Sequence, residues 1–279
     1  MPRRYRGLTF CTGSRFGETV IARAAIVLTA LVAIGLACAS PALADPPAPP
    51  GTPTATSFAG TPTVGPLFRD GLSADHECTA SVVASPSRDL ILTAAHCVFG
   101  TAAGWLFVPG YDRGATPYGV WTVTGAYVDA RWRVNQDPHY DYALLRVAPA
   151  GAVHLQDVTG AHLLGVAARS GETITDIAYN AGRDDDPIRC TTTAYRTDGY
   201  PSFNCHGYVG GSSGSPWLTV LFGGRLTIVR GVIGGLHQGG CFEYTSYSSP
   251  FTWRVYGLLA RASRHAPPDV VPEPGGDGC

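Results

Sequence analysis

The sequence predicts an all-β fold with two halves of similar size. Short apolar or alternating segments recur along the chain, and turn residues separate them. The 279 residues include 35 glycines and 22 prolines, and few segments have helical spacing. Two sets of short strands favour two antiparallel barrels or sandwiches packed together. A site between them would take residues from both halves.

Residues 1–44 have the features of a secretory signal peptide. A leader rich in arginine precedes the apolar run 24–37, and Ala42-Leu43-Ala44 forms a small-x-small cleavage site. The apolar run is short for a membrane span. A single-pass anchor and lipidation at Cys38 are the alternatives, although the residues before Cys38 fit a lipoprotein signal poorly. We expect cleavage after Ala44, an extracellular protein and no stable membrane association afterwards.

Cleavage at this site leaves six cysteines, which in an exported chain indicate disulfides. Sequence alone allows about 15 ways of pairing six cysteines. None of the spacings resembles a paired zinc motif, so we assign no metal and no cofactor. The formal net charge of −1 gives no indication of a nucleic-acid partner.

The N-terminal half is expected over residues 64–155. Before it, residues 45–63 are rich in Pro, Thr and Ala, lack the apolar content to pack, and predict a pro-segment or linker. The predicted strands alternate or are continuously apolar, and Pro/Gly turns separate them. They cover residues 78–84, 90–93, 105–108, 119–128 and 142–147.

The C-terminal half is expected over residues 156–265, and residues 266–279 are expected to be a flexible tail. Apolar residues from Trp253 to Ala262 recur at helical spacing, so the fold should close with a helix. Strands are predicted at residues 173–179, 190–195, 216–222 and 226–233.

Three short motifs supply the residue types that acyl transfer by serine requires. A nucleophilic serine needs a base, a carboxylate that orients the base, and N–H groups that stabilise the oxyanion. His96 follows a predicted strand in Thr93-Ala94-Ala95-His96-Cys97, and Asp141 opens another in Asp141-Tyr142-Ala143-Leu144-Leu145. Ser213 lies in Gly211-Ser212-Ser213-Gly214-Ser215-Pro216, where glycines permit a sharp turn.

These three motifs, in this order, resemble the histidine, aspartate and serine motifs of chymotrypsin-like serine proteases of the trypsin fold, bacterial secreted type. The resemblance spans about residues 64–263. It implies two six-stranded antiparallel β-barrels with the active site in the cleft between them. It also implies that Ser213 is the nucleophile, His96 the general base and Asp141 the orienting residue, with an oxyanion hole formed by the N–H groups of Gly211 and Ser213.

The resemblance also implies a Cys78–Cys97 disulfide beside His96. Proximity in the sequence pairs Cys190 with Cys205. Cys241 and Cys279 remain, and either they pair and hold the tail or one of them is free.

Three positions depart from the family pattern. Ser212 stands where the family usually has the aspartate that, in many animal members, pairs with a new N-terminus. The resemblance implies that Gly207, six residues before Ser213, forms the floor of the specificity pocket, where trypsin-type members have an aspartate. The substrate-binding segment 232–237, which includes Gly234, Gly235 and Leu236, lacks the usual Ser-Trp-Gly.

These departures predict a small or apolar residue, rather than Arg or Lys, before the cleaved bond. A glutamyl endopeptidase with His237 or His206 in its pocket is an alternative, as are an esterase and a catalytically silent binding protein of the same fold. The expected substrate is a protein or peptide, and the expected state is a monomer. The run Asp184-Asp185-Asp186 is interpreted as solvated turn charge, with calcium binding as the alternative.

Overall fold

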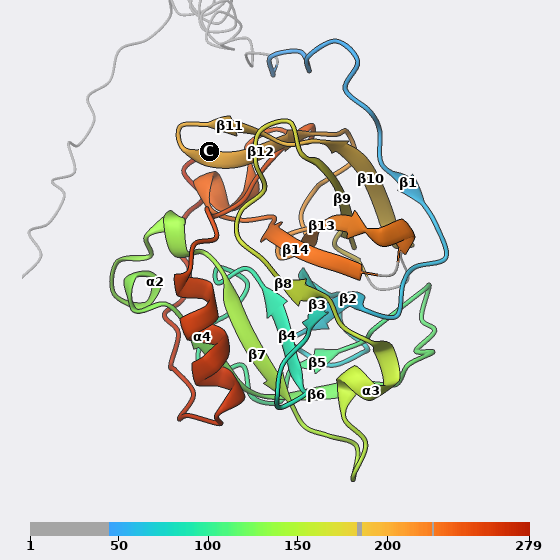
Figure 1. The fold of residues 1–279 in the computed structure, drawn as a ribbon, viewed down its shortest axis with the longest axis vertical. Coiled ribbons are helices and arrows are strands. Elements are labelled where there is room, and N and C mark those ends of the chain that lie inside the picture. Colours follow the sequence, from blue (N-terminus) through green and yellow to red (C-terminus); the bar gives the residue numbers. More distant parts are fainter. Residues whose placement is uncertain (1–44, 183–185, 225) are drawn as a thin grey trace, which may run out of the picture. The chain divides into compact units, whose positions relative to one another are not determined.

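The computed structural model describes residues 45–182, 186–224 and 226–279. The expected signal peptide, residues 1–44 with its predicted cleavage site, therefore lies outside the described residues. The chain divides into Met1–Pro46 and Pro47–Cys279, and the account below concerns the second unit. This unit consists mostly of strands and ends with one helix packed against them, so the predicted fold class is confirmed (Figure 1).

Six strands of the N-terminal half form a closed barrel, in the order β2-β3-β4-β7-β6-β5. All of its ladders are antiparallel, and β6 carries a bulge between Val123 and Gly125. The strands are β2 (Val64–Phe68), β3 (Cys78–Val83), β4 (Leu90–Thr93), β5 (Leu106–Phe107), β6 (Trp121–Val128) and β7 (Ala143–Val147).

Both faces of β4 are buried, which explains its continuous apolar sequence. Ile91 joins the core inside the barrel, together with Leu145 of β7. Leu90 and Leu92 point the other way, because successive side chains alternate across a strand. They join a second core that also contains Val229 and other residues of the C-terminal half. This shared core holds the two halves together.

The C-terminal half has two sheets instead of one continuous closed ladder. The first has the order β1-β10-β9-β13-β14-β8, and the second has the order β11-β12-β15. All pairs are antiparallel except β14 with β8. The strands are β1 (Thr56–Ser57), β8 (Leu163–Leu164), β9 (Thr173–Ala178), β10 (Ile188–Thr193), β11 (Tyr195–Thr197), β12 (Tyr200–Asn204), β13 (Pro216–Leu221), β14 (Leu226–Val232) and β15 (Thr245–Tyr247).

One apolar core joins these two sheets. Phe203 of β12 packs against Trp217 of β13, with ring centroids 4.9 Å apart, and both side chains are buried. The Cys190–Cys205 disulfide connects β10 to the residue after β12. The sheets thus enclose a common interior, as a second barrel would.

The helices are short except for the last one. α4 (Arg254–Ser263) lies beside β6 and β7 and buries Val255, Leu258 and Ala262 (Figure 1). Trp253, expected to belong to this apolar stripe, precedes the helix and is 79% exposed. The other helical segments are α2 (Ala130–Asn135), η1 (Pro138–Tyr140), α3 (Leu155–Thr159), η2 (Phe222–Gly224) and η3 (Leu236–Gly239).

The segment before the barrel was not expected to pack, yet it adds strand β1 to the edge of β10. His206 donates its N–H to Pro53 O at 2.8 Å, and Ala55 donates to His206 O at 2.9 Å. Backbone hydrogen bonds to an exposed strand edge require no apolar side chains, so composition did not reveal this contact.

Three disulfides join the cysteines of the described residues: Cys78–Cys97, Cys190–Cys205 and Cys241–Cys279. The third ties the last residue of the expected flexible tail to the C-terminal half. Within the described ranges, no helix has both the length and the apolar character needed to cross a membrane.

Candidate active site

His96 and Asp141 meet because they flank neighbouring strands of the barrel. His96 follows β4, Asp141 precedes β7, and Thr93 pairs with Ala143 in the antiparallel ladder. Residues after one strand and before its antiparallel partner lie at the same barrel end. His96 Nδ1 lies 2.7 Å from Asp141 Oδ2, and the His96 N–H donates to Oδ1 at 2.8 Å.

Asp141 is fully buried, and its oxygens accept hydrogen bonds from both halves of the molecule. Besides the two contacts with His96, Oδ2 accepts the N–H of Gly235 at 2.7 Å. A carboxylate accepts hydrogen bonds and does not donate them, so it places the imidazole proton on Nδ1. The other ring nitrogen, Nε2, is then free to accept a proton.

Ser213 lies on a turn that only glycine at its flanks allows. Gly211 and Gly214 have φ angles of 93° and 83°. A Cβ on Gly211 would lie 2.1 Å from Ala181 N. Thr79 of β3 secures the turn: its N–H donates to Ser213 O at 2.8 Å and its hydroxyl donates to Gly211 O at 3.0 Å. The turn is thereby fixed to the N-terminal barrel.

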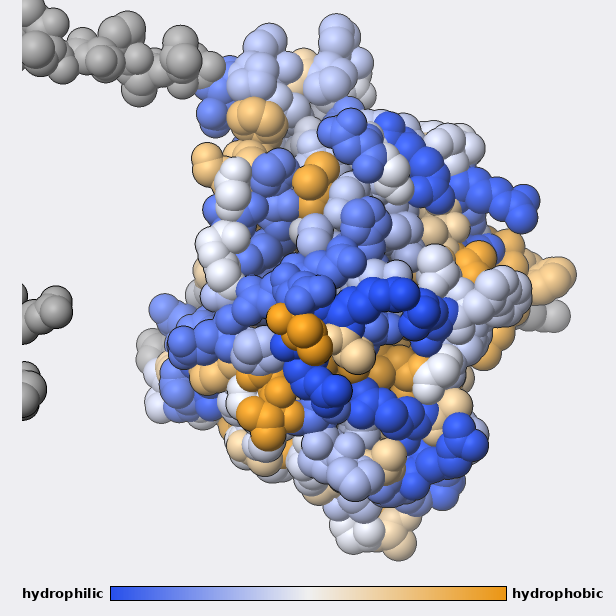
Figure 2. Space-filling view, turned by 90° about the vertical axis from the view of Figure 1, so that its left-hand side faces the viewer, coloured by the Kyte–Doolittle hydropathy of each residue, from blue (hydrophilic) through white to orange (hydrophobic). Residues whose placement is uncertain are grey.

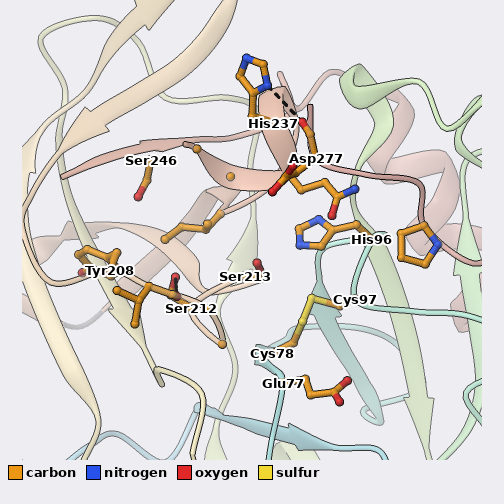
Figure 3. Close-up of a pocket in the computed structure, with 18 of the residues that line it drawn as sticks. Glu77, Cys78, His96, Cys97, Tyr208, Ser212, Ser213, His237, Ser246 and Asp277 are labelled. Carbon is orange, nitrogen blue, oxygen red and sulfur yellow. Dashed lines mark hydrogen bonds between the residues drawn. A yellow bond between two sulfur atoms is a disulfide. The ribbon is translucent and has the colours of Figure 1, made fainter. Parts of the chain in front are cut away.

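Ser213 and His96 line the same cavity and lie close together in Figure 3. Among the described residues, Ser213 Oγ makes no hydrogen bond, so the hydroxyl is available to a partner or substrate. Hydrogen bonds of catalytic serines are often long without substrate. The N–H groups of Gly211 and Ser213 also donate to no group in this part of the chain, and they belong to the same turn.

The cavity has a volume of about 710 Å³ and takes its walls from both halves. Tyr208, Val209 and Ile233 contribute apolar surface, and the Cys78–Cys97 disulfide lies beside His96 (Figure 3). This arrangement brings a serine hydroxyl, an oriented imidazole and two N–H groups without a partner among the described residues to one cavity.

A comparison with protein families finds one matching model, described as a trypsin-like peptidase domain, over residues 78–226. The chain belongs to this family. It is a serine endopeptidase by that membership. No curated protein matches the chain.

Solved structures with the same fold include bacterial proteases. Protease Anisep from Arthrobacter nicotinovorans is 22% identical with a TM-score of 0.64, over 76% of this chain and all of that one. The thermostable serine protease AL20 from an extremophilic microorganism is 23% identical, with a TM-score of 0.63, over 74% of this chain and 98% of that one. A Glu endopeptidase is 18% identical, with a TM-score of 0.60, over 77% of this chain and 99% of that one. At these identities the likeness shows the fold alone.

The four residues predicted to bind substrate do not line the cavity. Gly207 donates its N–H to Glu243 Oε2 at 2.8 Å, and Gly234 donates to Tyr247 O at 2.9 Å. Gly235 contacts Asp141, and Leu236 begins η3. Neighbours of these residues line the cavity instead, among them Tyr208, His237 and Gln238.

Two histidines near the site have partners. His206 Nδ1 lies 2.6 Å from Glu243 Oε1. Burial raises the pKa of Glu243, but the N–H of Gly207 and the His206 ring outweigh burial and lower the pKa below its usual value. His237 Nδ1 donates to Asp277 O at 3.1 Å.

Two clusters in the described ranges have the compactness of metal sites, one around Cys78 and Cys97 and one around Cys241 and Cys279. Each depends on both sulfurs of a disulfide, which offer no thiolate to a metal. Asp184 and Asp185, considered for calcium, lie outside the described residues.

Sequence reasoning missed one wall of the cavity, formed by Glu273, Pro274 and Asp277 of the C-terminal tail. The available signal was the pair of remaining cysteines, since a Cys241–Cys279 bond brings the tail to the loop after η3. It also missed Thr79, for which no local sequence signal exists.

Proposed function

We propose that this serine endopeptidase is secreted and cleaves peptide bonds through an acyl-enzyme on Ser213. The observation that carries the proposal is the buried Asp141–His96 pair facing Ser213 across one cavity. His96 Nε2 takes the hydroxyl proton as Ser213 Oγ attacks the peptide carbonyl. The resulting oxyanion accepts hydrogen bonds from the N–H groups of Gly211 and Ser213.

The proton on His96 then passes to the departing amine as the peptide C–N bond breaks, leaving an ester on Ser213. Water replaces the amine, and its oxygen attacks the ester carbonyl as His96 takes a proton from it. The ester C–O bond then breaks, His96 returns the proton to Ser213 Oγ, and the acid is released. Asp141 keeps the ring oriented and stabilises the imidazolium formed in each half-reaction, since it is buried and already hydrogen-bonded.

The residue before the cleaved bond is proposed to be small or apolar. The cavity wall next to Ser213 contains Tyr208, Val209 and Ile233, and a carboxylate there would find no free cation from His206. The glutamyl alternative through His206 is less well supported, because Glu243 lines the cavity, holds His206 and would repel an acidic side chain. The fold shared with a Glu endopeptidase does not decide between the two.

Secretion is supported by the three disulfides, which form and persist in oxidising compartments. A monomer is supported by the face in Figure 2, where hydrophobic residues gather only in small groups among hydrophilic ones. The proposed partner is a protein or peptide substrate.

The test is hydrolysis of a peptide library in which the residue before the cleaved bond varies, with release of p-nitrophenol from a nitrophenyl ester as a second readout. We expect the highest kcat/KM for Ala, Val or Leu and a burst of about one nitrophenol per enzyme. Ser213→Ala and His96→Ala should each lower kcat by roughly 10⁶-fold. A folded protein without a burst, or variants as active as the wild type, would contradict the proposal. A maximum at Glu would support the glutamyl alternative.

A further inference from the structure

The last seven residues form a segment across the cavity, which we call the C-terminal strap (residues 273–279). The chain before it is fixed to the barrel: Asp269 pairs with Ala126, and Val271 pairs with Gly100. At its other end, Cys279 is bonded to Cys241 in the loop that follows η3. The strap is therefore held at both ends, although three of its seven residues are glycines.

One residue of the strap connects the two halves of the enzyme. The N–H of Gly275 donates to Gln136 Oε1 at 2.7 Å, directly after α2 of the N-terminal half. The carbonyl of Gly275 accepts from Gln238 Nε2 at 2.7 Å, in η3 of the C-terminal half. Gln136 Nε2 also donates to Glu273 O at 2.6 Å.

The strap lies at the cavity that contains His96 and Ser213. Glu273, Pro274 and Asp277 line that cavity, and Asp277 O accepts from His237 beside it (Figure 3). A strap joined to both halves across a shared cavity limits how far an extended chain can run in that direction.

With the substrate backbone on the segment after β14, as the family resemblance implies, the strap lies toward the amino side of the bond to be cleaved. The segment after β14, which the family resemblance assigns to the substrate backbone, runs from Gly234 to Gly235 and then turns into η3 at Leu236. An extended substrate can pair only with backbone groups of this segment that are not already bonded. The N–H of Gly234 donates to Tyr247 O, the N–H of Gly235 donates to Asp141, and Gly235 O accepts from Gln238 N–H. Among the described residues, Gly234 O is therefore the one group of these two glycines left to pair. Beyond it η3, and the strap attached to it, interrupts the path, which leaves room for about two substrate residues.

We propose that the C-terminal strap closes the cleft on the amino side of the cleaved bond and sets a length preference. Peptides with about two residues before this bond fit the closed cleft, and longer chains are cleaved only when the strap moves away. This inference rests on the proposed function, because it assigns a substrate class to the same site.

The Cys241–Cys279 disulfide is the main restraint on the strap. Without it, Gly275, Gly276 and Gly278 would give the free end the flexibility of a glycine-rich linker. Cys241→Ser with Cys279→Ser should therefore open the cleft without changing His96, Asp141 or Ser213.

The experiment measures kcat/KM for fluorogenic peptides that share one residue before the cleaved bond and carry one to five residues on its amino side. For the wild type we expect a maximum near two residues and a loss of at least tenfold at four. The double serine variant should lose this maximum, and four-residue peptides should gain at least tenfold. Gln136→Ala with Gln238→Ala keeps the disulfide and should give an intermediate profile. Val134→Ala, on exposed α2 surface, is the matched control and should keep the wild-type profile.

A second readout does not need catalysis. In the Ser213→Ala background, anisotropy of a fluorescein-labelled peptide with four residues on the amino side should show at least tenfold tighter binding when both cysteines are serine. Equal length profiles and equal affinities in proteins with and without the Cys241–Cys279 disulfide would overturn the inference. Absence of hydrolysis in every protein would refute the proposed function, while the binding series would still decide the role of the strap.

Discussion

The two halves of the molecule contribute to the site by different structural means. In the N-terminal half, His96 and Asp141 flank adjacent strands of a closed barrel, and the register of β4 and β7 brings them together. In the C-terminal half, Ser213 lies on a glycine turn outside regular strands. The proposed proton-transfer pair is thus positioned by strand pairing, and the proposed nucleophile by backbone conformation.

This difference indicates where the enzyme can vary. A strand register cannot shift by one residue without turning every side chain to the other face, so the positions of His96 and Asp141 are rigidly specified. The substrate-facing parts of the C-terminal half are turns, η3 and a tethered tail, which tolerate changes of length and sequence. The C-terminal strap lies there.

The largest effect on activity should follow from breaking the hydrogen bond between Asp141 and His96. Asp141→Asn keeps the shape but replaces an acceptor by an amide, so His96 loses the partner that fixes its tautomer. We expect kcat to fall by about 10⁴-fold with the fold intact. Steady-state kinetics and circular dichroism would test this, and a loss below tenfold would contradict the role of Asp141.

The corresponding change in the C-terminal half is Gly211→Ala. Its Cβ would meet Ala181 N at 2.1 Å, so the turn must shift and displace the N–H groups that face the oxyanion. We expect kcat to fall by about 10²- to 10³-fold. Gly151→Ala is the matched control, since Gly151 also has positive φ, at 65°, but no atom lies within 4 Å of its added Cβ. Similar losses of kcat in both variants would show that the turn is not specifically required.

The free energy of unfolding provides a third test, at Asp269, which pairs with the barrel before the C-terminal strap. Asp269 is buried and accepts hydrogen bonds from Arg133, Arg261 and the N–H of Val128, at 2.8 Å, 3.0 Å and 2.9 Å. Burial raises its pKa, but these hydrogen bonds and the arginine charges outweigh burial, and the pKa lies below 3.8. Asp269→Asn should lower the free energy of unfolding by about 2 kcal/mol at pH 7.

The pKa of Asp269 is lower in the folded state than in the unfolded state. The stability that Asp269 contributes is therefore present above pH 3.8 and is lost as pH falls through the folded pKa. Denaturation of wild type and variant should therefore converge in strong acid. A difference that persists unchanged at pH 2 would contradict an electrostatic anchor.

The smallest effect, on stability, is expected from Asp176, which lies under the turn that carries Ser213. Asp176 is fully buried and accepts the Ser215 hydroxyl at 2.9 Å; burial raises its pKa well above 3.8. The stability it contributes is present below pH 3.8 and is lost as pH rises through the folded pKa. Asp176→Asn should flatten this pH dependence, with changes on the order of 1 kcal/mol. An unaltered pH profile of unfolding would show that Asp176 stays ionised.

The sequence revealed the family, the fold class and the three candidate catalytic residues because each depends on local patterns. Strand periodicity is visible over a few residues, and His96, Asp141 and Ser213 lie in short motifs at strand ends or between glycines. The paired cysteines also indicated where distant segments meet.

The features that the sequence did not reveal depend on contacts between distant segments. The pairing of β1 with β10 and the parallel pairing of β8 with β14 are made by backbone groups, which every residue carries, so composition gives no signal for them. The backbone of Gly275 bonds to the side chains of Gln136 and Gln238, and the hydroxyl of Thr79 bonds to Gly211 O in the opposite half. The sequence around these polar side chains does not show which distant backbone group they meet.

The most direct test of the account is mass spectrometry of the mature protein after reaction with a fluorophosphonate. We predict one adduct per molecule on Ser213, lost in Ser213→Ala and His96→Ala and retained in Ser212→Ala, whose hydroxyl donates to Val209 O. A folded wild type that forms no adduct, or an adduct on another serine, would contradict the assignment of Ser213 as the nucleophile.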